Sequence, residues 1–235
     1  QCRDGRDNDG EIEQQHGFGT EKPLECHHHG LACLLGKPGV NADEPEGEDA
    51  DKAEPLADAL CAGGLPCAEI TLRTETALKS IRALSGRADL LLGAGTVHGS
   101  EQARAAVDAG ARFIVTPGFN PKTVAWCLDN EVPVFPGTSS PTDLEMALDF
   151  GLKVVKFFPA EAIGGVKTLK AFAGPYGALR FIPTGGISPR NLPDYLVLPQ
   201  VVACGGSWMV TQDLINGDLF AEVTRLASEA VSFAK

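Results

Sequence analysis

The sequence predicts an α/β fold, a (β/α)8 barrel of parallel strands surrounded by helices. From about residue 56, short apolar runs alternate with helical stretches of roughly 10–14 residues. These runs are apolar throughout, which is typical of parallel strands that are covered on both faces. The unit of about 20 residues recurs seven times without a long interruption, which favours a closed barrel over an open doubly wound sheet.

The individual elements follow from the same alternation. The strands are expected at residues 68–72, 90–95, 112–116, 132–137, 153–158, 179–185 and 201–206. The helices are expected near residues 56–63, 75–85, 99–110, 120–130, 141–150, 166–173, 189–196 and 213–233. Three of them have a cap residue followed by proline at their start: Asn120-Pro121, Ser140-Pro141 and Ser188-Pro189. Gly86, Gly110 and Gly151 stand where helices should end.

The eighth strand of the barrel is not evident between residues 1 and 55, which we expect to form an irregular N-terminal segment ahead of a catalytic barrel domain at 56–235. Residues 41–55 are acidic, contain two prolines and read as solvated coil. Two alternatives remain for the first strand. Either LACLL (31–35) supplies it through a longer loop, or residues 1–55 have an unusual structure.

Composition narrows the function classes. The net charge of −11 argues against a general nucleic-acid binder, and residues 1–51 alone carry 13 acidic and 4 basic residues, so the body of the chain is nearly neutral. No apolar run suggests a transmembrane helix or a secretory signal. Seven cysteines without a CxxC pair indicate free thiols in a reducing compartment, so we expect a cytoplasmic protein. Cys26 and the three histidines after it form a weak zinc candidate, and we expect no metal.

The polar groups that carry chemistry stand at the ends of the expected strands, where a parallel barrel places its active site. Glu69 lies within the first legible strand, Arg73 follows it, and Lys156 lies near the end of the run KVVKFF (153–158). The strand ends further contribute Thr96, Pro117, Phe158, Thr184 and two glycine-rich loops. Arg73 could bind a substrate carboxylate with two hydrogen bonds, or it could form a surface salt bridge.

Lys156 is an unusual residue for a barrel strand. It alternates with Val155 and Phe157 and therefore shares a face with Val154 and Phe158, inside the barrel. An apolar interior disfavours the ammonium and lowers the lysine pKa, which yields an amine able to attack a ketone and form a Schiff base. Alternatively, a buried carboxylate neutralises Lys156. Glu69 could be that partner or a proton shuttle whose pKa is raised by burial.

The loops PTGGI (183–187) and CGGSW (204–208) follow the last two strands of the expected barrel. In such barrels these two loops frequently hold a phosphate through backbone N–H groups. Glycine lets the backbone approach the anion closely. The other interpretation is that the glycines only form tight turns.

Five segments together have a specific likeness: EITLRTE (69–75), GAGTV (93–97), KFFPAEAIGGVK (156–167), RFIPTGGISPRN (180–191) and GGSW (205–208). On these segments the chain from about Leu56 to Lys235 resembles the bacterial 2-keto-3-deoxy-6-phosphogluconate (KDPG) and 4-hydroxy-2-oxoglutarate (KHG) aldolases. The resemblance implies a homotrimeric barrel and a lyase that needs no cofactor and works through a covalent Schiff base. The implied reaction cleaves KDPG, a phosphorylated keto acid, to pyruvate and glyceraldehyde 3-phosphate in the Entner–Doudoroff route, with KHG as a further substrate.

The resemblance also assigns roles to residues of this chain. Lys156 corresponds to the Schiff-base lysine and Glu69 to the general acid and base. Arg73 and Thr96 correspond to contacts with the pyruvate carboxylate. The implied phosphate cradle consists of Gly185, Gly186, Gly206 and Ser207, and the implied pocket walls are Pro117, Phe158 and Thr184.

Two other function classes stay open on the residues alone. A phosphate-binding barrel isomerase or synthase could use Lys156 only for its charge, without a Schiff base. A non-catalytic barrel could serve as a binding or scaffold protein. Departures from the family pattern concern residues 42–55, where the family has an apolar first strand, and the loop Thr138-Ser139-Ser140.

Overall fold

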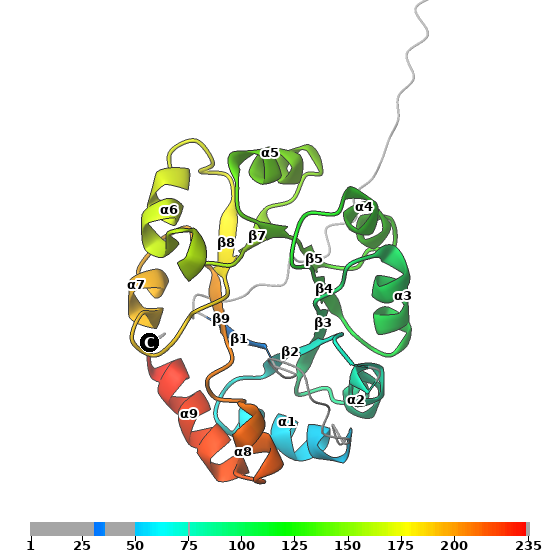
Figure 1. Cartoon of the computed structure of the whole chain (residues 1–235). Coiled ribbons are helices and arrows are strands. Elements are labelled where there is room, and N and C mark those ends of the chain that lie inside the picture. Colours follow the sequence, from blue (N-terminus) through cyan, green and yellow to red (C-terminus); the bar gives the residue numbers. More distant parts are fainter. Residues whose placement is uncertain (1–30, 36–49, 75, 234–235) are drawn as a thin grey trace, which may run out of the picture.

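The computed structural model describes residues 31–35, 50–74 and 76–233, and these form a ring of parallel strands enclosed by helices (Figure 1). The strands are β1 Leu31–Leu35, β2 Cys67–Thr71, β3 Leu91–Gly95, β4 Phe113–Val115, β5 Val134–Phe135, β6 Gly137–Thr138, β7 Val154–Phe157, β8 Arg180–Pro183 and β9 Ala203–Gly206. The helices are α1 Ala53–Ala62, α2 Ala77–Leu84, α3 Ser100–Asp108, α4 Pro121–Asp129, α5 Pro141–Asp149, α6 Gly165–Phe172, α7 Leu192–Leu196, α8 Gln212–Asn216 and α9 Phe220–Ser232, with short 3-10 helices at Ala50–Lys52 (η1) and Glu161–Ile163 (η2).

The strand ladder runs in two parts around the ring. One sheet has the order β5-β4-β3-β2-β1-β9, and the other has the order β6-β7-β8. β5 and β6 occupy one position of the ring on either side of Pro136, which has no N–H to donate to a ladder. Parallel bridges between Phe181 and Val201 and between Thr184 and Gly205 connect β8 with β9. The strands therefore fill the eight positions of a (β/α)8 barrel, and the single strand expected at 132–137 is two short ones.

β1 supplies the barrel position that the sequence left open. LACLL pairs in parallel with β9, where Leu31 is opposite Ala203, and with β2, where Leu34 is opposite Ala68. It thus lies between the first legible strand and the last one. Regular structure also begins before residue 56, because η1 and α1 cover Ala50–Ala62.

The main core lies between the strand ring and the surrounding helices. Val155 and Phe157 of β7 are fully buried. The ring of Phe157 packs edge-on against Phe172 of α6 and Phe181 of β8, with centroids 6.2 Å and 6.4 Å apart. Since neighbouring residues of a strand point to opposite faces, Lys156 faces the interior of the ring, as its sequence position predicts.

A smaller apolar cluster fills part of that interior. It consists of Cys67, Phe113 and Val115, with Leu91 and Phe135 packed against it. Cys67 lies two residues before Glu69 on the same face of β2, so this cluster forms a floor on the N-terminal side of the polar residues. The interior is therefore apolar at one end and polar at the other.

Two helix predictions were wrong in detail. The last helix, expected at 213–233, is divided into α8 and α9, because Gly217 ends α8 and Asp218 adopts a left-handed backbone with φ of 54°. The helix expected at 189–196 begins only at Leu192. The backbone N–H of Ser188 donates instead to the Asn191 side chain at 2.8 Å, so this stretch is a turn before the helix. The cap at Asn120 and the capping box at Ser140 are confirmed.

The remaining predictions concern the cysteines, the zinc candidate and membrane-spanning helices. Cys61, Cys67, Cys127 and Cys204 are free thiols, as expected. The zinc candidate at Cys26–His29 lies outside the described residues, as does most of the acidic stretch from residue 41. Among the residues that the structure describes, no helix is long and apolar enough to cross a membrane.

Candidate active site

Lys156 lies inside the barrel at the C-terminal end of β7. It pairs with Gly137 of β6 on one side and with Ile182 of β8 on the other, and only 5% of its surface is exposed. Its Nζ stands 4.9 Å from the centroid of the Phe158 ring. The hydroxyl of Thr138 donates to the Lys156 carbonyl at 2.9 Å, which adds to the ladder contacts that fix the strand here. The lysine is therefore buried, with an aromatic ring close to its amine.

Glu69 lies on β2 and faces the same interior, with 3% of its surface exposed. Burial raises the pKa of its carboxyl from 4.5 to about 7, although Lys156 and Arg73 lie close enough to act in the opposite direction. Its Oε1 atom has no hydrogen-bond partner among the described residues. A buried carboxyl with a pKa near neutrality and an unsatisfied oxygen can both give and take a proton.

Arg73 and Thr96 follow the ends of β2 and β3. Arg73 is exposed, and its backbone N–H donates to the Thr71 carbonyl at 2.9 Å in the turn that ends β2. Thr96 has a φ of 57°, a left-handed conformation that is costly for a β-branched residue. Such outliers gather at functional sites, because surrounding structure must hold them in place. Both residues lie on the rim at which Glu69 points into the ring.

The two glycine loops meet at the junction of β8 and β9. The bridge between Thr184 and Gly205 brings the ends of these strands together, and Gly185, Gly186 and Ser207 follow directly. Gly185 and Gly186 have φ of 92° and 85°, so they adopt backbone conformations that side-chain-bearing residues rarely take. Their loop is thus formed by the backbone itself, and the sequence expectation that the two loops adjoin is met.

Thr184 is the polar side chain at the base of these loops. It is 2% exposed, and its Oγ1 has no hydrogen-bond partner among the residues described. Ile182 of β8 pairs with Lys156, and Thr184 lies two residues after Ile182. The Thr184 side chain therefore lies on the same interior face of the barrel as the lysine. A buried hydroxyl without a partner is costly unless a ligand or water completes it.

Pro117 and Phe158 lie at the same end of the barrel as Lys156. A Cβ at Gly185 would come within 3.2 Å of the Phe158 ring, so Phe158 lies between Lys156 and the glycine loop. Pro117 follows β4, and its carbonyl lies against the Cα of Gly137, which is the ladder partner of Lys156. The structure therefore brings both predicted wall residues to the end of the barrel that holds the lysine.

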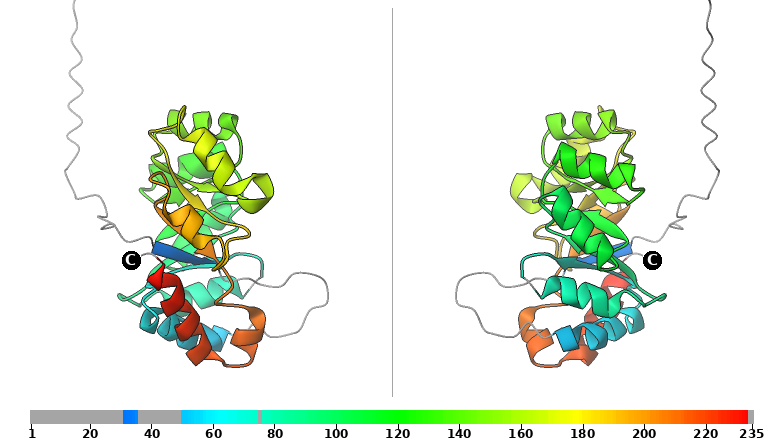
Figure 2. Two further views of the ribbon diagram at one scale, coloured as in Figure 1. Left: turned by 90° about the vertical axis from the view of Figure 1, so that its left-hand side faces the viewer. Right: turned by 90° about the vertical axis from the view of Figure 1, so that its right-hand side faces the viewer.

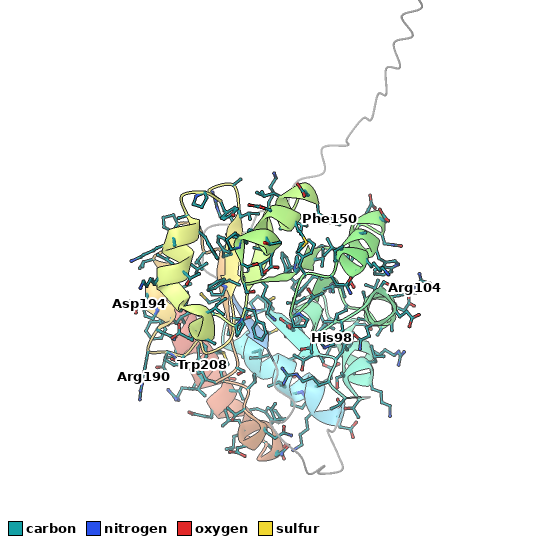
Figure 3. All side chains as sticks on the ribbon, turned by 45° about the horizontal axis from the view of Figure 1, so that its top comes forward. His98, Arg104, Phe150, Arg190, Asp194 and Trp208 are labelled. Atoms are coloured by element: carbon teal, nitrogen blue, oxygen red, sulfur yellow. The ribbon has the colours of Figure 1, made fainter. Side chains whose placement is uncertain are left out.

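Glycines at three positions make the arrangement possible, and only one of them was assigned from the sequence. A Cβ at Gly95 would overlap the Glu69 carboxylate, and one at Gly137 would overlap the Pro117 backbone. A Cβ at Gly206 would overlap the ring of Trp208, which Figure 3 labels on the loop after β9. The signals for Gly95 and Gly137 were their positions at strand ends, but their neighbours come from distant parts of the sequence.

Other charged groups lie away from this centre. Arg190 is exposed and stands at the outer rim near Asp194 of α7 (Figure 3).

The two side views show that the helices form an outer layer, with α1 and α9 packed side by side (Figure 2). Within the described part of the chain, no group of three or more potential metal ligands gathers.

Comparison with known proteins supports a common origin. A family model described as "KDPG and KHG aldolase" matches residues 46–226. The 2-dehydro-3-deoxy-phosphogluconate aldolase of Treponema pallidum is 51% identical over 185 residues, which cover 78% of this chain and 88% of that protein. The corresponding enzyme of Haemophilus influenzae is 49% identical over 189 residues, covering 80% and 89%.

Solved structures agree with these relatives. The KDPG aldolase of Legionella pneumophila, crystallised with pyruvate captured as a covalent carbinolamine intermediate, is 37% identical with a TM-score of 0.76 and covers 83% of this chain and 92% of that one. The KDPG aldolase of Zymomonas mobilis ZM4, crystallised with 3-phosphoglycerate, is 36% identical with a TM-score of 0.76 and covers 88% and 92%.

Proposed function

The chain belongs to the KDPG and KHG aldolase family, and from this premise we propose that Lys156 is the amine through which it acts. The chain is a lyase, a carbon–carbon aldolase that cleaves KDPG to pyruvate and glyceraldehyde 3-phosphate. The observation that carries the residue assignment is the burial of Lys156 beside Glu69 at the C-terminal end of the barrel. We further propose that KHG is cleaved in the same site to pyruvate and glyoxylate.

In the proposed reaction, the neutral amine of Lys156 attacks the C2 ketone to form a carbinolamine, which loses water to give an imine. The protonated imine then accepts the electron pair of the C3–C4 bond as that bond breaks. A base takes the proton of the C4 hydroxyl, so the aldehyde leaves and an enamine of pyruvate remains. Protonation at C3 and hydrolysis of the imine release pyruvate and restore the amine.

Glu69 is the group that we propose moves these protons. With its pKa near 7, the carboxyl can protonate the departing hydroxyl of the carbinolamine and later deliver a proton to C3. Its burial excludes competing water and keeps the proton close to the reacting atoms. Its Oε1 has no hydrogen-bond partner among the described residues and lies against the Cα of Gly95.

The two anionic ends of KDPG are assigned to opposite sides of Lys156. We propose that Arg73 and Thr96 contact the pyruvate carboxylate, since a guanidinium can bind a carboxylate with two hydrogen bonds. We propose that Gly185, Gly186, Gly206 and Ser207 hold the phosphate through backbone N–H groups and the serine hydroxyl. Pro117, Phe158 and Thr184 border the space between. Anchoring at both ends orients the C3–C4 bond for cleavage.

The alternative functions lack such support. The comparisons favour the aldolase, and no observation favours an isomerase, a synthase or a scaffold.

We propose that the reaction needs no cofactor beyond the covalent bond at Lys156. We also propose that the partner is a small molecule rather than nucleic acid or membrane, and that the chain works in the cytoplasm. A homotrimer is proposed from the resemblance alone, and light scattering on the purified chain tests it.

Borohydride trapping tests the central assignment. Incubation with pyruvate and reduction should add one pyruvate-derived group at Lys156, located by peptide mass spectrometry. Lys156→Met should abolish both the adduct and turnover while the chain still folds. Lys153→Met is the matched control, because Lys153 is exposed three residues away, and it should keep both. An adduct at another lysine, or an active Lys156→Met variant, would refute the assignment.

A further inference from the structure

Glu161 and Tyr195, which have no role in the proposed reaction, form a polar contact beside the Gly185–Gly186 loop. Glu161 begins η2, five residues after Lys156, and Tyr195 lies in α7. The Tyr195 hydroxyl donates a hydrogen bond to Oε1 of Glu161. Tyr195 is fully buried, and burial together with the Glu161 carboxylate raises the pKa of its hydroxyl, so the phenol stays the donor.

Glu161 also touches the glycine loop in two ways. Its backbone N–H donates to the Gly185 carbonyl at 3.1 Å. A Cβ at Gly186 would lie 2.7 Å from Cγ and 2.8 Å from Cβ of Glu161, so the side chain rests on the Cα of that glycine. One residue earlier, the Ala160 N–H donates to the Thr184 carbonyl at 2.8 Å. The segment around Glu161 is thus fastened along the loop that leads from β8.

Gly165 leaves room for the pair itself. A Cβ there would lie 2.6 Å from the Tyr195 hydroxyl and 2.8 Å from Oε1 of Glu161. Gly165 has a φ of 54°, and its N–H donates to the Ala160 carbonyl at 2.9 Å. The backbone therefore turns around the contact between carboxylate and phenol, which joins the loop after β7 to α7.

The charge of Glu161 makes its position informative. A carboxylate beside a loop that binds phosphate repels the ligand unless it is turned away. The bond from Tyr195 draws the carboxylate toward α7, while the aliphatic part of the side chain supports Gly186. This geometry suits a residue that places the loop and does not itself contact the anion.

We propose that Glu161 and Tyr195 are a positioning pair that sets the Gly185–Gly186 loop relative to Lys156 and thereby selects substrates with a phosphate. The path between the two sites is short, because Phe158 touches both Lys156 and the Gly185 side of the loop. This inference rests on the proposed function, in which that loop holds the phosphate. A shift of the loop should weaken binding of the phosphorylated end and leave the pyruvate end unaffected.

The test compares a phosphorylated and an unphosphorylated substrate in four variants. Tyr195→Phe and Glu161→Ala should each raise KM for KDPG by about tenfold, with kcat changed less, because misplacing an anchoring group by about 1 Å can cost up to 100-fold. Kinetic constants for KHG, which has no phosphate, should stay within about twofold. Glu161→Gln should keep most of the KDPG affinity, since its amide oxygen still accepts from Tyr195. The double variant Glu161→Ala/Tyr195→Phe should lose no more than either single change.

Tyr176→Phe is the matched control. The Tyr176 hydroxyl donates to Glu145 at 3.3 Å in a similar tyrosine–glutamate contact on the outside of the barrel. Removal of the Tyr176 hydroxyl should leave the kinetic constants for both KDPG and KHG unchanged. Thermal unfolding of each variant, and borohydride trapping of pyruvate at Lys156, check that the barrel and the amine are intact.

The outcomes separate this inference from the function beneath it. A loss confined to KDPG in Tyr195→Phe and Glu161→Ala, with restoration by Glu161→Gln, supports the positioning pair. Equal losses for KDPG and KHG, additive effects in the double variant, or no change at all would overturn it. A wild-type chain that fails to trap pyruvate would instead overturn the proposed function, whatever these variants show.

Discussion

The carboxylate of Glu69 lies directly over the Cα of Gly95, at the end of the neighbouring strand β3. A Cβ at Gly95 would overlap Oε1 and Cδ of the glutamate and lie 2.7 Å from its Cγ. The two strands are paired in register beside this contact, with Glu69 opposite Gly93 and Thr71 opposite Gly95. The missing side chain of Gly95 therefore creates the space that the carboxyl occupies.

Gly95→Ala should displace Glu69 and strain β3. We expect the free energy of unfolding to fall by about 1–3 kcal/mol, typical of overpacking, and kcat/KM for KDPG to fall by about 100-fold. Gly86→Ala is the control, because a Cβ at that position would meet no other part of the chain within 4 Å, and it should change neither value appreciably. Denaturant unfolding and initial rates measure both. An active Gly95→Ala variant would contradict the role of Glu69.

Glu69→Gln should alter the pH dependence of stability. In the folded chain Glu69 holds its proton up to a pKa of about 7, while in the unfolded chain it ionises near 4.5. Between these values unfolding releases a proton, so the wild-type chain loses stability as pH rises from about 4.5 to 7, by about 3 kcal/mol, and no more above that. The variant lacks this loss. Urea unfolding of both at several pH values tests it, and parallel curves would contradict the raised pKa.

Thr184→Val should separate stability from activity. Replacing a buried hydroxyl without a partner by a methyl group of similar size should raise the free energy of unfolding by about 1 kcal/mol. The activity should fall, because the Thr184 side chain lies on the same interior face of the barrel as Lys156. Thr123→Val is the matched control: Thr123 of α4 is also fully buried with an unpartnered hydroxyl, but it lies in an outer helix. It should gain stability without losing turnover, and equal activities in the two variants would argue against a ligand role for Thr184.

Arg73→Lys should raise KM for KDPG and KHG alike, by about tenfold, because an ammonium cannot match the two-point contact of a guanidinium with a carboxylate. Both substrates carry the pyruvate carboxylate, so the pattern differs from that expected for the Glu161–Tyr195 pair. Arg82→Lys, at an exposed position of α2, serves as the control and should leave KM unchanged. An effect on KDPG alone would place Arg73 at the other end of the substrate.

The sequence indicates the positions of the proposed site residues more directly than it indicates how the barrel closes. Lys156 was placed in the interior by the alternation with Val155 and Phe157, which is a local pattern, and strand ends located the glycine loops in the same way. The sequence leaves two alternatives for the first strand, because the partner strand β9 is some 170 residues away from β1 and no local signal encodes that pairing. The contact of Glu69 with Gly95 and that of Glu161 with Gly186 could not be read either, since each joins segments that meet only in the fold.

Pro136 and the β8–β9 junction give the barrel two seams, and the proposed substrate site straddles both. Lys156 stands on the three-stranded sheet, whereas Glu69 and Gly95 stand on the six-stranded one. At the second seam Gly185 follows β8, and Gly206 ends β9. A substrate bound between the three-stranded and the six-stranded sheet would contact both sheets and hold them together. Loosening either seam would then scatter the reacting groups before a single strand had unfolded, so turnover should be an early indicator of barrel integrity.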